Sequence, residues 1–465
     1  MANIEKRGEN TYRLTAYAGY DSSGKQLKKR KTVKLKVGLT DKQRDKELNR
    51  LATLFDDEVE KGLYLDGDKI TFREVAQMWL EHVQKRHAPK TLATYKSRLT
   101  DRIIPALGHI KLSKIQPHHL EGFYDSLEKE GVRLDAKYSP TVKLGDVLNQ
   151  FTAIALAEKT SINERTIRKI KNKHSTNYKT AEKLCVSLNL KFKDMFKPCG
   201  KTKLSEKSIR HHHDVVRTVL SFAVKRNLIT TNPAQRVDFE KMPEYEASYY
   251  DETDITTLCE ALRSEPIMYR TLIYLAIDSG MRTGEITGLL WSDIDFETGY
   301  VTVTKQRQYV NGYGIIIKEP KTKSGKRILT LSATVTSMLK EYYEEQKRNL
   351  EKIDAQWSES LEVFTHADGV PIYPGRPHQW FTGFLKRHNL KKITFHQLRH
   401  TNASLMIAAG VDMVTLANRL GHADSNITQS TYAHIIRSKE KQAANVMDMF
   451  YTKTTATAKK IERIG

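Results

Sequence analysis

The chain has 465 residues, of which 39% are hydrophobic and 28% charged, so it is large enough for about three domains and too apolar for global disorder. Lys and Arg number 77 against 55 Asp and Glu, a net charge of +22, which argues against an ordinary small-metabolite enzyme and favours a polyanionic partner. No apolar run is long enough to span a membrane, and the N-terminus lacks the apolar stretch of a signal peptide. The three cysteines are too scattered for a disulfide framework or a zinc site. We therefore expect a cytoplasmic protein whose leading partner is nucleic acid.

The first segment, residues 1–65, predicts a small basic domain. Residues 1–50 read as three strands and a helix, and they hold 14 Lys and Arg against 6 Asp and Glu. Lys34 and Lys36 alternate along the third strand, as expected for a face that contacts DNA. A merely solubilising surface is an equally good interpretation of the charge alone.

A helical domain is predicted from two separated stretches, residues 70–131 and 201–240. Thr71 is placed to cap the first helix, Pro105 and Gly108 to stop the second, and residues 205–229 have strong helical periodicity. The acidic, Tyr-rich stretch 240–254 reads as an interdomain linker.

Between the two stretches, residues 132–200 have a pattern of their own. A small-residue helix, a tight connection at 161–163 and a basic second helix resemble the helix-turn-helix domain of phage repressors over about sixty residues. The resemblance implies that the second helix faces a major groove with Arg165, Thr166, Arg168 and Lys169. The alternative is a helical insert that contacts protein.

Residues 250–450 predict a larger domain that mixes helices with strands, followed by a C-terminal tail, 451–465. Strand turns are predicted at Asn311–Gly312 and Ser324–Gly325. The fold class expected for the whole chain is mainly α with small β-sheets (α+β).

Six residues of the last 190 suggest one chemistry when they are taken together. Each is weak alone, since an isolated Arg, Lys or His is more often solvated or structural. They are Arg282 in SGMRTGE, Lys323 in PKTKSGKR, His396 and Arg399 in FHQLRHT, His422 in RLGHAD and Tyr432 in STYAH.

These residue types match the needs of phosphodiester strand transfer. Two guanidiniums can hold both non-bridging oxygens and neutralise the charge that grows in the transition state. A phenolic nucleophile gives a covalent phosphotyrosine, a Lys can protonate the departing 5′ oxygen, and imidazoles can bind phosphate or handle the tyrosine proton. Because no carboxylate cluster accompanies them, we expect metal-free chemistry without a cofactor.

In this order the motifs resemble those of the tyrosine recombinases, specifically the integrases of phages and integrative conjugative elements. The resemblance implies an arm-binding sheet, a helical core-binding domain and a catalytic domain. It also implies that Arg282, Lys323, His396, Arg399, His422 and Tyr432 are catalytic, with Tyr432 as the nucleophile. Glu285 is then a structural partner of the active-site arginines. The implied partners are double-stranded DNA at core and arm sites, a homotetramer on that DNA, and a directionality or DNA-bending factor.

Several residues leave alternatives open. Lys321 and Lys326 compete with Lys323 for the turn. The triplet His211–His213 is expected on a DNA-facing or solvated surface, because three consecutive helix positions cannot converge on one ion. Trp291 and Trp380 are expected in the core, and Arg307 and Arg327 either on DNA backbone or in solvent. For the whole chain, the competing functions are a type IB topoisomerase and a non-catalytic DNA-binding regulator.

Overall fold

The computed structural model divides the chain into two compact units, residues 1–240 and 241–465, which are described separately. It describes residues 2–20, 23–60, 69–129, 133, 136–200, 202–242, 248–320, 325–422, 424, 426, 428–429 and 431–432. Lys321, Lys323, Ser324 and the predicted tail 451–465 lie outside these ranges. Among the described helices, none is long and apolar enough to cross a membrane.

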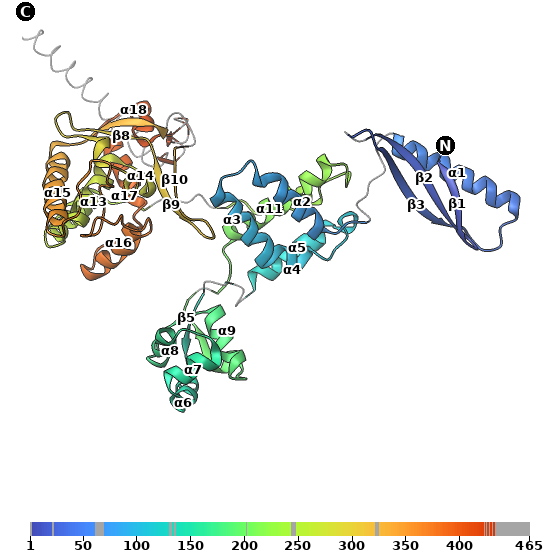
Figure 1. Cartoon of the computed structure of the whole chain (residues 1–465), viewed down its shortest axis with the longest axis horizontal. Coiled ribbons are helices and arrows are strands. Elements are labelled where there is room, and N and C mark those ends of the chain that lie inside the picture. Colours follow the sequence, from blue (N-terminus) through green and yellow to red (C-terminus); the bar gives the residue numbers. More distant parts are fainter. Residues whose placement is uncertain are drawn as a thin grey trace, which may run out of the picture. The chain divides into compact units, whose positions relative to one another are not determined.

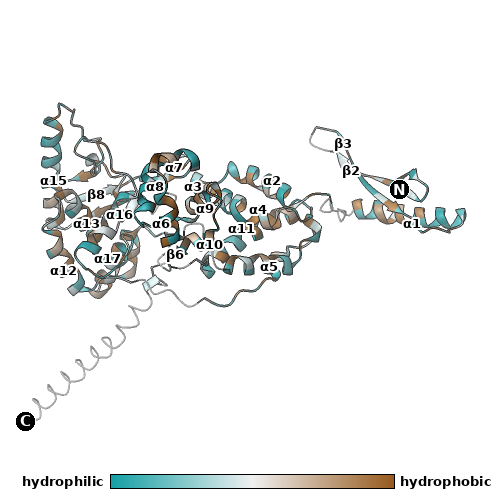
Figure 2. Cartoon of the chain, turned by 90° about the horizontal axis from the view of Figure 1, so that it is seen from below, coloured by the Kyte–Doolittle hydropathy of each residue, from teal (hydrophilic) through white to brown (hydrophobic). Residues whose placement is uncertain are grey.

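The N-terminal part of the first unit is a three-stranded antiparallel sheet packed on one helix (Figure 1). Its elements are β1 (Asn3–Gly8), β2 (Thr11–Tyr20), β3 (Gln26–Lys34) and α1 (Asp41–Glu60). Leu14 and Ala16 of β2 are buried against Ala52, Phe55 and Val59 of α1. Apolar and polar bands alternate along α1 because one side packs and the other is solvated (Figure 2).

Alternation along the strands gives this sheet a second, basic face. The register pairs Arg13 with Thr32 and Tyr17 with Lys28, while the buried Leu14 lies between them on the opposite face. Lys28 stacks its ammonium over the Tyr17 ring. The predicted Lys34 is exposed at the end of β3, and Lys36 is exposed just beyond it.

A helical fold with its own core follows, and it is built from two chain segments. Its helices are α2 (Phe72–Gln84), α3 (Pro89–Arg98), a π-helical turn (Leu99–Ile103), α4 (Ile104–Leu107), α5 (Pro117–Glu128) and α11 (Glu206–Lys225). Buried side chains of α2, α5 and α11, such as Trp79, Phe123 and Val219, share one core. The predicted cap at Thr71 is confirmed, since Thr71 and Glu74 form a capping box.

Two local predictions in this helical fold are wrong. Pro105 does not stop the helix, because it falls at the start of α4, directly after a π-helical turn, where a missing N–H is tolerated. His212 and His213 are not on the surface. His213 Nδ1 lies 3.1 Å from the buried Tyr124 hydroxyl, so this part of the triplet belongs to the core.

Residues 136–198 form a separate small fold with a third core. Its elements are β4 (Lys137–Pro140), α6 (Val142–Asn149), α7 (Ala153–Thr160), α8 (Glu164–Lys171), β5 (Thr176–Asn177), α9 (Tyr178–Ser187), α10 (Phe192–Met195) and β6 (Phe196–Pro198). The first and last strands, β4 and β6, pair with each other. The fold therefore begins and ends at one place, as an insertion between α5 and α11 should.

The second unit packs helices around small antiparallel sheets. Its helices are α12 (Glu252–Leu262), α13 (Ile267–Ser279), α14 (Thr283–Ile286), α15 (Ala333–Glu351), α16 (Arg376–Arg387), α17 (Gln397–Ala408) and α18 (Met413–Leu420). Its strands are β7 (Ile294–Asp295), β8 (Tyr300–Val303), β9 (Gln306–Val310), β10 (Gly314–Lys318) and β11 (Arg327–Thr330). The strands form the sheets β11-β8-β7 and β10-β9, and the predicted turn at Asn311–Gly312 joins β9 to β10.

Trp291 and Trp380 lie in the large core of this unit, as expected. The predicted linker 240–254 is too long, because Tyr250 is fully buried and α12 begins at Glu252. Tyr250 donates its hydroxyl to the Lys391 carbonyl, a contact between distant segments that composition does not reveal. The predicted fold class, mainly α with small sheets, is confirmed.

Candidate active site

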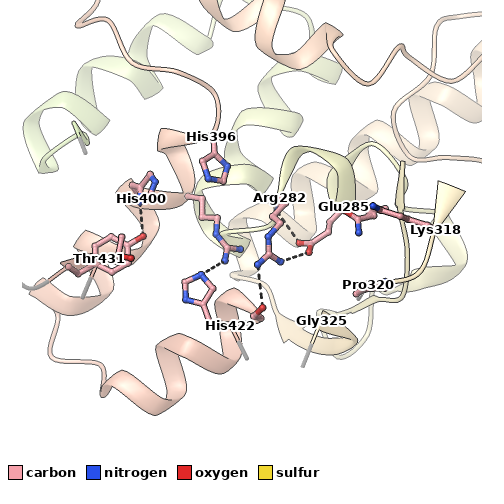
Figure 3. A pocket seen from close by; sticks show the side chains of 13 residues that line it. Arg282, Glu285, Lys318, Pro320, Gly325, His396, His400, His422 and Thr431 are labelled. Carbon is pink, nitrogen blue, oxygen red and sulfur yellow. Dashed lines mark hydrogen bonds and ion pairs between the residues drawn. The ribbon is translucent and has the colours of Figure 1, made fainter. Parts of the chain in front are cut away.

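The short connection between α13 and α14 positions Arg282. Gly280 ends α13 with φ 63°, and a Cβ there would lie 2.7 Å from Asn402 Oδ1, so the turn requires glycine. Arg282 then caps α14: its backbone N–H donates to Glu285 Oε2 over 2.9 Å, and its Nη1 donates to Glu285 Oε1 over 2.9 Å. The guanidinium is thereby fixed at the rim of a cavity (Figure 3).

Glu285 is buried and joins two arginines. Its Oε2 accepts from Arg327 Nη2 at 3.0 Å, and its Oε1 accepts from Arg282. Burial raises the pKa of Glu285, but the hydrogen bond and charge of Arg327, with the donors of Arg282, outweigh burial and hold the pKa below its usual value. Glu285 is therefore a carboxylate that orients cations.

Arg399 enters the same cavity from α17. Its Nη1 donates to the Gly280 carbonyl at 2.8 Å and its Nη2 to the Leu420 carbonyl at 2.7 Å. Burial and then the charge of Arg282 lower the pKa of Arg399 to about 9, which leaves it cationic at neutral pH. Two guanidiniums from different helices thus line one cavity.

His422 follows α18 and contacts Arg399. Its Nε2 lies 2.8 Å from Arg399 Nη2, and its Nδ1 lies 2.8 Å from Thr428 Oγ1. Burial, then Arg399 and Arg282, lower the pKa of His422 to about 4. His422 is therefore neutral, with Nε2 accepting from Arg399 and Nδ1 donating to Thr428.

Tyr432 is buried, with its hydroxyl 2.8 Å from Nδ1 of His400. Burial raises the pKa of Tyr432 to about 12, although the charge of Arg399 lowers it in part. Burial, then His396 and Arg399, lower the pKa of His400 to about 4, so this histidine is neutral and its Nδ1 can accept the phenolic proton.

His400 is a site residue that the sequence analysis missed. It comes directly after Arg399 and four residues after His396, so the helix places both histidine rings on one side, 5.4 Å apart. The repeated histidine in FHQLRHT was the available signal. Burial, followed by Arg399 and Arg282, also lowers the pKa of His396.

One cavity of about 540 Å³ brings most of the predicted residues together. Figure 3 shows them converging from α14, α17 and the segment after α18. Lys318, at the end of β10, also lines this cavity and was not singled out from the sequence. The predicted Lys323 and its competitor Lys321 lie outside the described residues. Lys326 pairs with Glu319 at 2.7 Å. The cavity is lined by Arg282, Glu285, Gln306, Lys318, Pro320, Gly325, His396, Arg399, His400, Gly421, His422, Thr431 and Tyr432.

Arg307 and Arg327 are neither solvated nor exposed for DNA, contrary to both expectations. The side chain of Arg327 is only 7% exposed, and its Nε donates to the Arg419 carbonyl at 2.7 Å while its Nη2 donates to Glu285. Arg307 is buried with Nη1 3.7 Å from Glu362. Within the described residues, no group of three His, Cys, Asp or Glu side chains is arranged to hold a metal ion.

A sequence model described as the phage integrase family matches residues 249–439, which include every described member of the cavity. A second model, the N-terminal SAM-like domain of phage integrases, matches residues 71–127. The chain belongs to the phage integrase family. Members of this family are tyrosine recombinases, which cleave and rejoin DNA strands at specific sites.

Relatives of this integrase support the assignment over nearly its whole length. The chain is 25% identical over 462 residues to a "Tyrosine recombinase XerC-like" protein of Caldanaerobacter subterraneus subsp. tengcongensis, covering 96% of this chain and 98% of the relative. It is 24% identical over 277 residues to the ICEBs1 integrase of Bacillus subtilis, covering 60% of this chain and 75% of the relative.

The fold is also that of a solved integrase structure. The Tn1549 transposon integrase (residues 82–397 of that protein), solved in complex with transposon right end DNA, is similar with a TM-score of 0.54 and 16% identity. The match covers 81% of this chain and 100% of that chain.

Proposed function

We propose that the cavity around Arg282, Arg399 and Tyr432 binds one phosphodiester of duplex DNA and breaks it with Tyr432 as the nucleophile. The observation that supports this most is convergence. Two guanidiniums, three imidazoles and a phenol from segments more than a hundred residues apart line one cavity. A purely DNA-binding regulator has no use for a buried phenol beside two arginines.

In the proposed reaction, the Tyr432 oxygen bonds to phosphorus while the bond from phosphorus to the 5′ oxygen breaks. The phenolic proton leaves the tyrosine, and the 5′ oxygen gains a proton to depart as a hydroxyl. The product is a 3′-phosphotyrosine, and attack by a 5′ hydroxyl of another strand reverses the step and rejoins DNA. No net bond energy is lost, so no ATP is required.

The arginines are assigned to the phosphate. Arg282 and Arg399 would each donate to a non-bridging oxygen and stabilise the charge that develops in the transition state. Glu285 would keep Arg282 in place through its two hydrogen bonds. His396 would donate an N–H to one of the same oxygens. His422 would accept from Arg399 through Nε2 and so hold that guanidinium in place.

Two further groups are needed, one to accept the phenolic proton and one to protonate the 5′ oxygen. His400, neutral and 2.8 Å from the Tyr432 hydroxyl, is positioned to accept the phenolic proton. Lys323 remains our proposal for the donor to the 5′ oxygen, and Lys318 is the described lysine that lines the cavity and competes for that role.

The remaining parts are proposed to bind DNA at two addresses. The segments 70–131 and 201–240 would bind the core site beside the catalytic domain, 250–450. The basic face of the sheet in residues 1–65, including Lys28, Lys34 and Lys36, would bind an arm site. Four protomers would act on paired sites, with a directionality or DNA-bending factor. A type IB topoisomerase shares the phosphotyrosine chemistry but has no need for a second DNA address.

The test is to trap the protein on DNA in bacterial cells that carry the mobile element, and to sequence the covalently attached ends. The wild-type chain should give 3′ ends that map to one nucleotide position at paired sites. Tyr432→Phe should give none, because only the nucleophilic oxygen is lost, whereas Tyr300→Phe, at an exposed tyrosine of the same unit, should behave as wild type. Adducts formed by the Tyr432→Phe variant would assign the nucleophile elsewhere, and adducts spread over random sites would favour the topoisomerase.

A further inference from the structure

The insertion at residues 136–198 lies outside both family matches. The SAM-like domain match ends at residue 127, and the phage integrase match begins at residue 249. It has its own core, centred on Leu144, Leu156, Ile167 and Leu184, all with no exposed surface. The recombination chemistry proposed above uses none of its residues. A folded module of this size calls for a function of its own.

We infer that this insertion is a sequence-specific DNA-binding domain that gives the integrase a further DNA address, distinct from the core and arm sites. The inference goes beyond the proposed recombination function. It rests on the geometry of α7, α8 and the turn between them.

The turn is built to hold two helices at a fixed angle. α7 ends at Ser161, which adopts the left-handed conformation with φ 50°, and Asn163 caps α8 by accepting from the Arg165 backbone N–H at 2.9 Å. Lys183 of α9 donates to the Ser161 carbonyl at 2.7 Å. Ile162, between the two caps, is buried. A three-residue connection with a left-handed residue is typical of the helix-turn-helix unit.

The two helices have opposite characters, as Figure 2 shows, with α7 mostly apolar and α8 mostly hydrophilic. Ile167 and Ile170 of α8 are buried in the insertion core. Because successive helix residues turn by about 100°, Arg165 points directly away from those two isoleucines, with Arg168 and Lys169 on either side of it. All three basic side chains are exposed.

The exposed basic face of α8 differs from an ordinary solvated helix face because part of its positive charge is not paired with acidic side chains of the described residues. Arg168 donates to Glu164 at 2.8 Å, whereas the described residues show no acidic partner for Arg165 or Lys169. Lys171, at the end of α8, is instead used within the fold, where it donates to the Phe151 carbonyl at 2.8 Å. Residues 136–200 contain 13 Lys and Arg against 5 Asp and Glu, a net charge of +8. This face therefore suits the electronegative major groove.

The position of each basic residue along α8 determines which groups of the DNA it could contact. In helix-turn-helix proteins the first residues of the second helix contact base edges, while the first helix crosses the phosphate backbone. Arg165 is the second residue of α8 and is a bidentate donor of the kind that recognises guanine. The ligand is accordingly duplex DNA of defined sequence, and Lys169 would contact base or phosphate one turn further along.

The experiment selects bound sequences from a random library of 30-base-pair duplexes with the full-length protein, at a fixed salt concentration. The variant is Arg165→Ala/Lys169→Ala, which spares Arg168 and so does not release Glu164 toward the DNA. The control is Lys191→Ala/Lys193→Ala, which removes the same charge from exposed residues next to and within α10, outside the helix-turn-helix. Thermal unfolding of all three proteins checks that the insertion stays folded.

The wild type and the control should enrich the same set of motifs, and the α8 variant should lose one motif while keeping the others. Its affinity for that motif should fall at least tenfold, with affinity for a scrambled duplex changed far less. Motifs shared by all three proteins would overturn the inference and leave the insertion as a spacer or a protein-contact module. A uniform loss on every duplex would also overturn it, since phosphate contact alone carries no sequence information. Covalent adducts on core DNA should form with all three proteins, so failure of this inference is distinguishable from failure of the recombinase proposal.

Discussion

The Nδ1 atom of His400 lies 2.8 Å from the hydroxyl oxygen of Tyr432, so the proposed nucleophile contacts a proton acceptor. The contact brings together α17 and the segment that follows α18. A phenol with a pKa of about 12 is almost fully protonated at neutral pH. Its attack on phosphorus therefore depends on removal of this proton.

We predict that His400→Ala slows covalent cleavage by at least tenfold while leaving DNA affinity unchanged, because a positioned base typically contributes about 10²–10⁴-fold. Single-turnover adduct formation on core DNA measures the rate. His400→Asn keeps an acceptor near Nδ1 but is not a base. If the Asn variant recovers the full rate, His400 only positions Tyr432 and does not take its proton.

Arg282→Lys and Arg399→Lys should each reduce cleavage by about 10²–10³-fold, since a point charge cannot reproduce two parallel donors on a phosphate. Arg263→Lys, at the C-cap of α12 and outside the cavity lining, is the matched control. Rates within a few-fold of wild type for both cavity variants would refute the phosphate-binding assignment.

Glu285→Gln should lower the unfolding free energy of the second unit by about 3 kcal/mol. The substitution leaves the buried Arg327 guanidinium without its charge partner, which is costly away from water. Glu319→Gln breaks an exposed pair with Lys326 and should change this free energy by less than about 1 kcal/mol. Urea unfolding followed by tryptophan fluorescence measures the unfolding free energy, because Trp291, Trp357 and Trp380 all lie in this unit. Equal effects of the two variants would contradict the buried pairing.

Acid should destabilise the second unit across the window from about pH 6.5 to 4. In that window the unfolded chain protonates His400 and His422, whereas their lowered pKa values of about 4 keep them neutral in the fold. Because the unfolded state binds more protons, stability falls as pH falls. The fluorescence melting temperature at pH 7 and pH 5 measures this. Between these two pH values the melting temperature of His400→Gln/His422→Gln should fall less than that of the wild type. The control His366→Gln, at an exposed histidine, should show the same fall as the wild type.

Deleting residues 1–65 should abolish integration while sparing covalent cleavage of short core duplexes. Their sheet, packed on α1 with its own core, would hold the arm site and contributes nothing to the cavity. Nuclease footprints of the full-length and shortened chains on attachment-site DNA should differ by the arm segments alone. Coincident footprints would show that the basic face of the sheet is not an arm-binding surface.

Much of the local structure was predictable because short-range rules decide it. The strands of the first fifty residues follow from alternation, and the start of α2 follows from the Thr71 and Glu74 capping box. Family membership was equally accessible, since it rests on the order of motifs from Arg282 to Tyr432. The roles of the individual site residues and the domain boundaries stay predictions.

Apart from Pro105, whose outcome is local, the failures share one physical cause, which is contact between segments distant in the sequence. Tyr250 lies in a polar, acidic stretch, yet it is fully buried through its contacts with α17 and Lys391. In the sequence, Arg327 resembles a solvated strand residue. In the structure, its guanidinium donates a hydrogen bond to Glu285, which lies 42 positions away.

The sequence by itself thus determined which segments are helices and strands, the separate pattern of residues 132–200, and the family to which the chain belongs. Only the tertiary structure decided that His400 faces Tyr432, that Glu285 joins two arginines, and that His400 and His422 are neutral. Periodicity and capping depend on neighbours within about four residues, so they are written in the sequence. Burial, and the pKa values and ion pairs that burial controls, depend on which distant segments pack together.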